Sequence, residues 1–261
     1  MTAARPLSSG LCSVTFRQLD PVQVVSVAAA AGLEGIEWGA DVHVPAGDLK
    51  AAAAATRATN DAGLRVASYG SYLFADEASR AAIGPVLDTA EALGTDLIRV
   101  WCPFGVGPAA ARPDRDAVAD VLAEWATAAV GRGLTLYLEF HGGTLTASAA
   151  STVALLAQVG ATNVATAWQP PYWATRSPAA DDGADLAVLA PWLAHVHVYE
   201  WAADLTRLPL AAGVDHWPAA LRAAAEGRAD LDRFALIEFV PDDDPALLAA
   251  EAATLRGWLA R

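Results

Sequence analysis

The sequence repeats one pattern along its length: an Ala-rich segment of helical character, a glycine, and then a short run of β-branched or aromatic residues. The glycine stands where the end of a helix often needs a left-handed residue. Six glycines hold this place: Gly32, Gly63, Gly94, Gly133, Gly160 and Gly227. Strands that alternate with helices are typical of a parallel sheet. The pattern predicts eight strands, at residues 11–16, 35–38, 64–69, 97–101, 135–141, 164–168, 195–201 and 234–240.

The spacing of these strands indicates one kind of α/β fold. Seven intervals separate residue 11 from residue 234, so one strand and its helix occupy about 32 residues, as in a barrel of eight such units. No linker or shift in composition divides the chain. We therefore expect a single (β/α)8 TIM barrel domain over residues 1–261. An open, doubly wound sheet is the alternative, but no G-x-G-x-x-G motif follows the first predicted strand.

Composition limits which binding partners and which cellular compartment we expect for this chain. Hydrophobic residues make up 54% of the chain and charged residues 18%, which excludes intrinsic disorder. The net charge of -13 repels nucleic acid and anionic lipid, so we expect neither nucleic acid nor membrane as a partner. The apolar runs are too short to span a bilayer, and the first residues lack the apolar core of a signal peptide. A cytoplasmic protein is expected, with Cys12 and Cys102 as small buried hydrophobic residues.

Three predicted strands each carry a glutamate near the carboxyl end: Glu37, Glu139 and Glu238. Strands of a TIM barrel are covered on both faces, so a carboxylate within one needs a partner. The longest predicted loops also follow strands, and in a barrel these loops form the face that carries active sites. The sequence therefore predicts a polar site at that face.

A divalent metal ion is one partner that these carboxylates could share. Glu139, Gln169, His197 and Glu238 come from four successive strands and offer mainly oxygen ligands, which suit Mn²⁺, Mg²⁺ or Co²⁺, with Zn²⁺ as the alternative. The competing interpretation is that each glutamate pairs with an arginine such as Arg99, which also lies in a predicted strand. Glu37 fits either interpretation equally well.

The histidines differ in how well they suit a role as metal ligand or substrate contact. His197 lies nearer the end of its strand than His195, so we assign the ligand role to His197; His195 is then a buried, hydrogen-bonded residue or a substrate contact. His141 precedes a Gly-Gly loop and is expected to contact substrate or orient Glu139, unless it is a solvated cap. His43 is a weaker candidate substrate contact, and His216 is weaker still.

Aromatic residues crowd the same strand ends. Flat rings beside carboxylates suit a sugar or polyol, because C–H faces stack on rings and hydroxyls bind polar groups. The alternative is packing between helices and barrel, which we expect for about half of them. The expected substrate contacts, with Arg99 and the histidines above, are Trp38, Tyr69, Trp101, Trp168, Tyr199 and Trp201; Tyr72, Tyr172 and Trp173 lie in the same regions.

Several motifs together resemble one family. GLEGIEWGADVHVP, VASYGSY, ALGTDLIRVW, LYLEFHGGTLT, WQP, HVHVYEW and IEFV, in this order, resemble the xylose-isomerase-like TIM barrels, a family of sugar phosphate isomerases and epimerases with apurinic endonuclease relatives. By this resemblance, Glu139 and Glu238 match two metal-binding glutamates that also serve as acid and base in epimerases, and His197 matches the ligand on the seventh strand.

The sequence departs from the family pattern at Gln169, where the common member has an aspartate. A neutral ligand implies weaker metal binding. Two branches do not fit. Xylose isomerases resemble two-metal enzymes with an active-site lysine on a strand, whereas Lys50 lies in a predicted helix. The DNA-repair branch builds a trinuclear zinc cluster from many histidines, and this chain has five.

We therefore expect a metal-dependent isomerase or epimerase that moves a proton through a cis-enediolate of a sugar or related polyol-ketone. The scarcity of lysine favours an unphosphorylated substrate. One alternative is a dehydratase or lyase on the same scaffold. Another is a sugar-binding barrel without activity, whose metal site has degenerated. The sequence leaves the oligomeric state open between monomer and homodimer.

Overall fold

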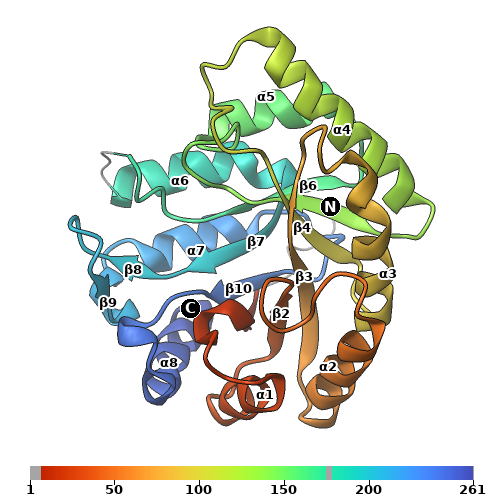
Figure 1. Cartoon of the computed structure of the whole chain (residues 1–261). Helices are drawn as coiled ribbons and strands as arrows, with labels where there is room; N and C mark the ends of the chain where they lie inside the picture. Colours follow the sequence, from red (N-terminus) through yellow and green to blue (C-terminus); the bar gives the residue numbers. More distant parts are fainter. Residues whose placement is uncertain (1–6, 175–177, 261) are drawn as a thin grey trace.

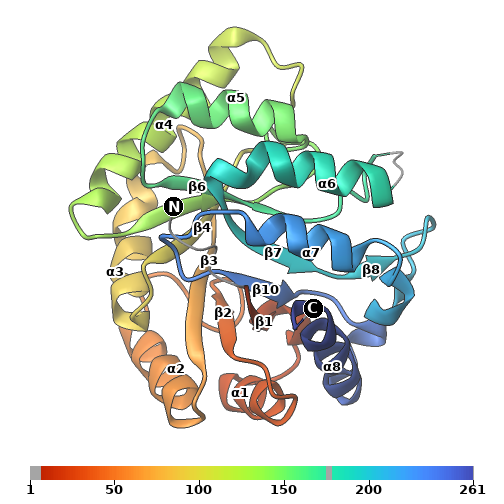
Figure 2. The same cartoon turned by 180° about the vertical axis from the view of Figure 1, so that it is seen from behind.

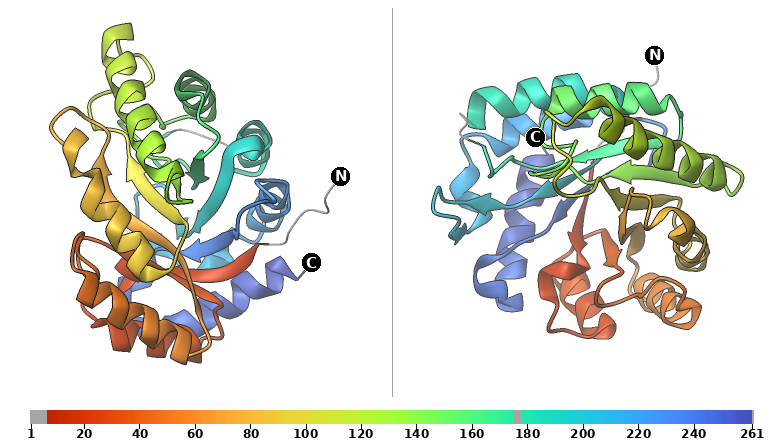
Figure 3. Two further views of the ribbon diagram at one scale, coloured as in Figure 1. Left: turned by 90° about the vertical axis from the view of Figure 1, so that its right-hand side faces the viewer. Right: turned by 45° about the horizontal axis from the view of Figure 1, so that its top comes forward.

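Eight parallel strands close into one barrel, which confirms the predicted fold (Figure 1). The computed structural model describes residues 7–174 and 178–260. Around the barrel the strands run in the order β1, β2, β3, β4, β5, β6, β7 and β10, and β10 pairs with β1 to close it (Figure 3). Their bounds are β1 Ser8–Cys12, β2 Gly35–Gly39, β3 Arg65–Phe74, β4 Leu97–Trp101, β5 Thr135–Leu138, β6 Val164–Trp168, β7 Leu193–Val198 and β10 Phe234–Ile237.

In the described residues, eight α-helices surround the barrel, one after each of its strands (Figure 2). They are α1 Pro21–Ala30, α2 Leu49–Asp61, α3 Ile83–Leu93, α4 Arg112–Val130, α5 Ala149–Val159, α6 Pro178–Leu189, α7 Trp217–Ala225 and α8 Leu248–Leu259. Asp20 begins α1 with a reciprocal capping box to Gln23. Within the described residues, no helix is both long and apolar enough to cross a membrane.

Four of the predicted strands end earlier in the structure, and this changes the setting of the candidate residues. The first runs over Ser8–Cys12, and a 3-10 helix, η1 Ser13–Phe16, replaces its predicted second half. Strands β5 and β10 stop immediately before Glu139 and Glu238. The predicted strand 195–201 is divided between β7 and a short hairpin of β8 Glu200–Trp201 with β9 Arg207–Leu208. The two glutamates therefore stand on the barrel's rim.

The layer of the barrel near the amino ends of the strands is packed so closely that it requires glycine. Gly10 on β1 lies opposite Gly35 on β2, and the aromatic ring of Phe234 fills the space beside both. A Cβ atom at position 10 would lie 2.6 Å from the Leu236 side chain and 3.0 Å from the Gly35 carbonyl oxygen. Because Gly10 and Gly35 have no side chains, β1 and β2 can pack closely against the large residues of β10.

We predict that Gly10→Ala lowers the free energy of unfolding by about 1–3 kcal/mol, because the added methyl group overpacks this layer. Gly257→Ala is the matched control: a Cβ there meets no atom within 4 Å, and the site is inside α8. The control should gain about 0.5–1 kcal/mol from helix propensity. Urea unfolding measures both, and equal shifts in the two variants would contradict the packing argument.

Candidate active site at the carboxyl end of the barrel

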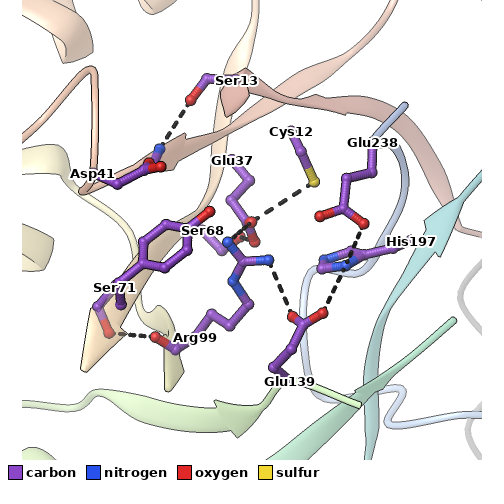
Figure 4. A network of polar contacts seen from close by, with 12 residues as sticks. Cys12, Ser13, Glu37, Asp41, Ser68, Ser71, Arg99, Glu139, His197 and Glu238 are labelled. Atoms are coloured by element: carbon purple, nitrogen blue, oxygen red, sulfur yellow. Dashed lines mark hydrogen bonds and ion pairs between the residues drawn. The ribbon is translucent and has the colours of Figure 1, made fainter. Parts of the chain in front are cut away.

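Glu139, His197 and Glu238 converge at the carboxyl end of the barrel (Figure 4). Glu139 directly follows β5, His197 lies near the end of β7, and Glu238 directly follows β10. His197 Nδ1 is 3.6 Å from Glu139 Oε1 and 3.4 Å from Glu238 Oε2. Each strand places one donor atom toward the same point, and all three side chains are almost completely shielded from solvent.

The spacing of these atoms suits a shared metal ion. Two ligand atoms that each lie about 2.1 Å from one ion, at angles of 90–110°, are roughly 3.0–3.4 Å apart. Neither ring nitrogen of His197 nor Glu238 Oε2 makes a hydrogen bond of normal geometry with the described part of the chain. Buried polar atoms rarely remain without a partner, so a divalent cation held by Glu139, His197 and Glu238 fits this donor set.

Arg99 on β4 connects this group to a second carboxylate deeper in the barrel. Its Nη1 donates to Glu139 Oε2 at 3.0 Å, and its Nη2 lies 3.2 Å from Glu37 Oε1 on β2. The Glu37 carboxylate also accepts hydrogen bonds from Ser68 Oγ at 2.7 Å, from Tyr137 Oη, and from the Cys12 thiol at 3.7 Å. Glu37 is thus fully occupied by protein partners, whereas Glu139 keeps Oε1 turned toward His197.

The charges of this cluster leave a place for two positive charges. Three carboxylates, on Glu37, Glu139 and Glu238, face one guanidinium, on Arg99. With His197 neutral, as it would be when it binds an ion, these groups carry two net negative charges, which are unfavourable in a buried site and which one divalent ion would neutralise. The sum of the charges and the spacing of the ligand atoms therefore both support a divalent cation.

Neighbouring charges shift the pKa of Glu139, Glu37 and His197 in the direction of the ionised form. Burial alone would raise the pKa of Glu139, but His197 and Arg99 outweigh it and lower that pKa to about 2. Burial opposes ionisation of Glu37 as well, yet Arg99 and His197 lower its pKa. Burial lowers the pKa of His197, while Cys12, Glu139 and Glu238 raise it well above the ordinary value. Glu139, Glu37 and His197 are therefore charged when only protein surrounds them.

Gln169, the fourth expected ligand, directly follows β6 and contacts Glu139. Its Nε2 donates to Glu139 Oε1 at 3.0 Å and to the Phe140 carbonyl oxygen at 2.6 Å. Because both partners are acceptors, the amide nitrogen must be the atom that faces them. Gln169 therefore positions Glu139, and metal binding through Gln169 Oε1 stays a prediction.

Aromatic side chains form a rim above the carboxylates. The His141 ring lies 5.2 Å from that of Trp101 and 5.4 Å from that of Trp173, and its Nε2 is 2.9 Å from the hydroxyl of Tyr172. From Tyr172 the rim continues through rings that contact one another in turn: Trp201, Tyr199 and Phe239. Such a wall suits the C–H faces of a polyol.

Comparison with known proteins identifies the family of this chain. The model of the xylose isomerase-like TIM barrel matches residues 25–258. The chain belongs to this family. Curated protein sequences give no significant match.

Three solved structures are similar to this chain along almost its whole length. A probable 3-DHS dehydratase, AsbF, of Bacillus anthracis, involved in petrobactin synthesis, aligns with a TM-score of 0.80 at 20% identity, over 96% of this chain and 99% of its own. A D-allulose 3-epimerase of Methylomonas sp. in complex with D-allulose aligns at 0.72 and 18%, over 97% of each chain. A xylose isomerase-like barrel protein of Mycobacterium smegmatis in complex with magnesium aligns at 0.73 and 15%, over 99% of this chain and 98% of its own.

Within this xylose isomerase-like barrel, three of the expected aromatic contacts face outward. Trp38 donates from Nε1 to Thr59 on α2, and the Tyr69 hydroxyl donates to the Val44 carbonyl oxygen. Trp168 packs edge-on against Trp217 of α7. All three are fully buried between barrel and helices. The structure does not bring them to the candidate site, because strand alternation turns them away from Glu37, Ser68 and the barrel interior.

Two expected histidine contacts are corrected as well. His195 lies inside the barrel one layer below His197, fully buried, where Nδ1 accepts from the Phe234 backbone N–H at 3.0 Å. His43 is held by Ser13 Oγ at 3.0 Å and by the Leu19 carbonyl oxygen at 3.1 Å. Nδ1 of His195 and both ring nitrogens of His43 thus face structural partners, and both rings are buried.

Other residues at the site were missing from the sequence-based set or stood low in it. Ser68, Tyr137 and Cys12 complete the Glu37 network, and Phe104 and Phe239 extend the aromatic rim. Alternation within strands could have indicated Tyr137, which lies two residues before Glu139. Nothing in the local sequence marks Phe104, because it stands in a loop and meets His141 only through the fold.

We predict that Arg99→Met lowers the free energy of unfolding by about 3–5 kcal/mol, because it leaves Glu37 and Glu139 buried without their shared cation. Adding Glu37→Gln removes one unpaired charge, so the double variant should be more stable than Arg99→Met alone. Urea unfolding of both variants measures this. A single variant with the midpoint of the unsubstituted protein would contradict the role of the pair.

His43 predicts a pH dependence of stability. Burial lowers its pKa below the ordinary value of 6.5, so the folded protein favours the neutral ring. As the pH falls below 6.5, the unfolded chain takes up a proton before the folded one does, and stability decreases. In urea unfolding between pH 7.5 and 5, His43→Gln should lose stability less steeply than the unsubstituted protein. Parallel slopes would show that His43 does not contribute.

Proposed function

We propose that the protein is a divalent-metal-dependent isomerase or epimerase of an unphosphorylated sugar or related polyol-ketone. The observation that carries this proposal is the convergence of two rim carboxylates and one imidazole, 3.4 and 3.6 Å apart, below an aromatic wall. Mn²⁺, Mg²⁺ or Co²⁺ suits these ligands best, with Zn²⁺ as the alternative. The magnesium complex and the D-allulose complex among the similar structures agree with such a cation and such a ligand.

The residues divide the chemistry among them. A divalent ion would supply positive charge that stabilises an enediolate. Glu139 and Glu238 follow two different strands, β5 and β10, to either side of His197, so one can remove the α-proton and the other can return one at the neighbouring carbon or the opposite face. Arg99 holds Glu139 Oε2 and thereby keeps the carboxylate oriented. The rings of Trp101 and Tyr199 would exclude water from the reacting atoms.

A dehydratase is the second candidate, because the similar structure with a TM-score of 0.80 is that of a probable dehydratase. The first step, removal of an α-proton, is common to both reactions, and they differ in whether a β-hydroxyl then leaves. Mass spectrometry of the product separates them: an unchanged mass indicates isomerisation, and the loss of one water indicates dehydration.

We predict that Glu139→Gln and Glu238→Gln each abolish turnover of ketoses by the Mn²⁺-loaded protein, because each removes a proton-transfer group and a charged ligand. In D2O the unsubstituted protein should incorporate deuterium at the carbon next to the carbonyl, and both variants should not. Glu226→Gln, an exposed carboxylate on the outer surface, is the control. Circular dichroism verifies that the variants fold.

Two results would contradict the proposal. Full activity of Glu139→Gln would exclude that residue from proton transfer. Equal Mn²⁺ affinity in the unsubstituted protein and both glutamate variants, measured by titration calorimetry, would show that the metal binds elsewhere. A folded protein that binds neither Mn²⁺ nor a ketose would instead point to the barrel without activity.

A further inference from the structure

A cavity of about 480 Å³ lies beside the carboxylate site. One wall comes from the segment after β6, and the other comes from Tyr199, which follows β7, from the β8–β9 hairpin, and from His216 before α7. None of Glu139, His197 and Glu238 lines it, so it is additional to the proposed reaction centre. The lining residues are Pro170, Tyr172, Trp173, Ala174, Tyr199, Glu200, Trp201, Ala202, Ala203 and His216.

Four aromatic rings and one hydrogen-bonded acid give this cavity its chemistry. The rings of Tyr172 and Trp201 are 4.6 Å apart, and Tyr199 and Trp173 continue the same surface. Glu200 is fixed through Oε2, which faces His216 Nε2 at 2.9 Å and accepts from Trp217 Nε1 at 3.1 Å. The contacts to Oε2 leave Glu200 Oε1 as an acceptor for hydroxyl groups.

The described lining contains no lysine or arginine. Its histidine, His216, is held between two carboxylates, with Nδ1 2.9 Å from Asp182 and Nε2 2.9 Å from Glu200. The cluster of His216 with these two acids is therefore not positive in total. Among the described lining residues a phosphate would find no cation, whereas an uncharged polyhydroxylated ring would find stacking surfaces and an acceptor.

The cavity is within reach of the reaction centre. Glu200 follows His197 by three residues, a span of at most about 10 Å, and Pro170 follows Gln169 directly. Tyr172 connects the two sites, because its ring lines the cavity while its hydroxyl is 2.9 Å from His141 Nε2. Burial and the charges of Glu238 and Glu139 raise the pKa of Tyr172, which agrees with a position near both carboxylates.

We propose that this cavity binds an uncharged glycosyl unit attached to the reacting ketose, so that the substrate is a glycosylated keto-sugar rather than a free monosaccharide. The inference rests on the proposed function, since it places the ketose carbonyl at the carboxylate site. The volume of about 480 Å³ lies within the range of small-molecule sites and accommodates a hexose ring beyond the reacting unit.

Titration calorimetry with Mn²⁺-loaded protein tests the proposal with three probes: D-fructose, and the fructose-containing disaccharides isomaltulose and lactulose. At least one disaccharide should bind ten-fold or more tightly than D-fructose. Trp201→Leu, which removes a stacking ring, should reduce this ratio to about two-fold or less. Ala203→Trp, which fills the cavity from the hairpin, should do the same if Trp201→Leu does not fold. Leu205→Asn, at the exposed turn of the same hairpin, should keep the ratio.

Each result decides a different question. D-fructose bound as tightly as both disaccharides would overturn the glycosyl pocket and leave the proposed function intact. A ratio that both cavity variants preserve would show that the additional sugar binds elsewhere, and this too overturns the inference. No binding of any of the three sugars, with Mn²⁺ bound, would count against the proposed function itself.

Discussion

The ion pairs of Arg99 with Glu37 and Glu139 are the interactions on which the rest of the interior depends. A guanidinium and two carboxylates that are 1–2% exposed are costly to bury, and their separations of 3.0 and 3.2 Å compensate this only while all three stay in place. Glu37 is neutralised in this way and further held by Tyr137 and Ser68. The remaining negative charge is thereby concentrated at the rim, on Glu139 and Glu238.

Strand alternation separates this polar interior from the apolar shell. On β2, Glu37 faces the interior and Trp38 faces α2; on β3, Ser68 faces the interior and Tyr69 faces outward. A closed barrel thus collects polar groups from neighbouring strands without exposing them. The glycines of the lower layer, Gly10 among them, allow the large residues of β10 to fill the other end.

The sequence was sufficient for the fold and for the position of the site, and it was less informative about side-chain direction. The recurring glycine and Ala-rich segments predicted all eight strands, and Glu139, His197 and Glu238 do meet. The direction of the aromatic residues at strand ends was not predictable in this way, because Trp168 and Trp101 are the last residues of equally buried strands yet face opposite sides. The predicted strand ends also differed from those in the structure, because pairing with a neighbouring strand far along the chain determines where a parallel strand stops.

The neutral side chain of Gln169 fits the charge balance of the carboxylate site. Because Arg99 neutralises Glu37, the charges of Glu139 and Glu238 alone equal those of one divalent ion. An aspartate at position 169 would add a further buried negative charge beside Glu139. The amide instead donates to Glu139 Oε1 and Phe140, which orients the carboxylate and adds no charge. The neutral residue is therefore consistent with a functional metal centre in a barrel that carries its own buried ion pair.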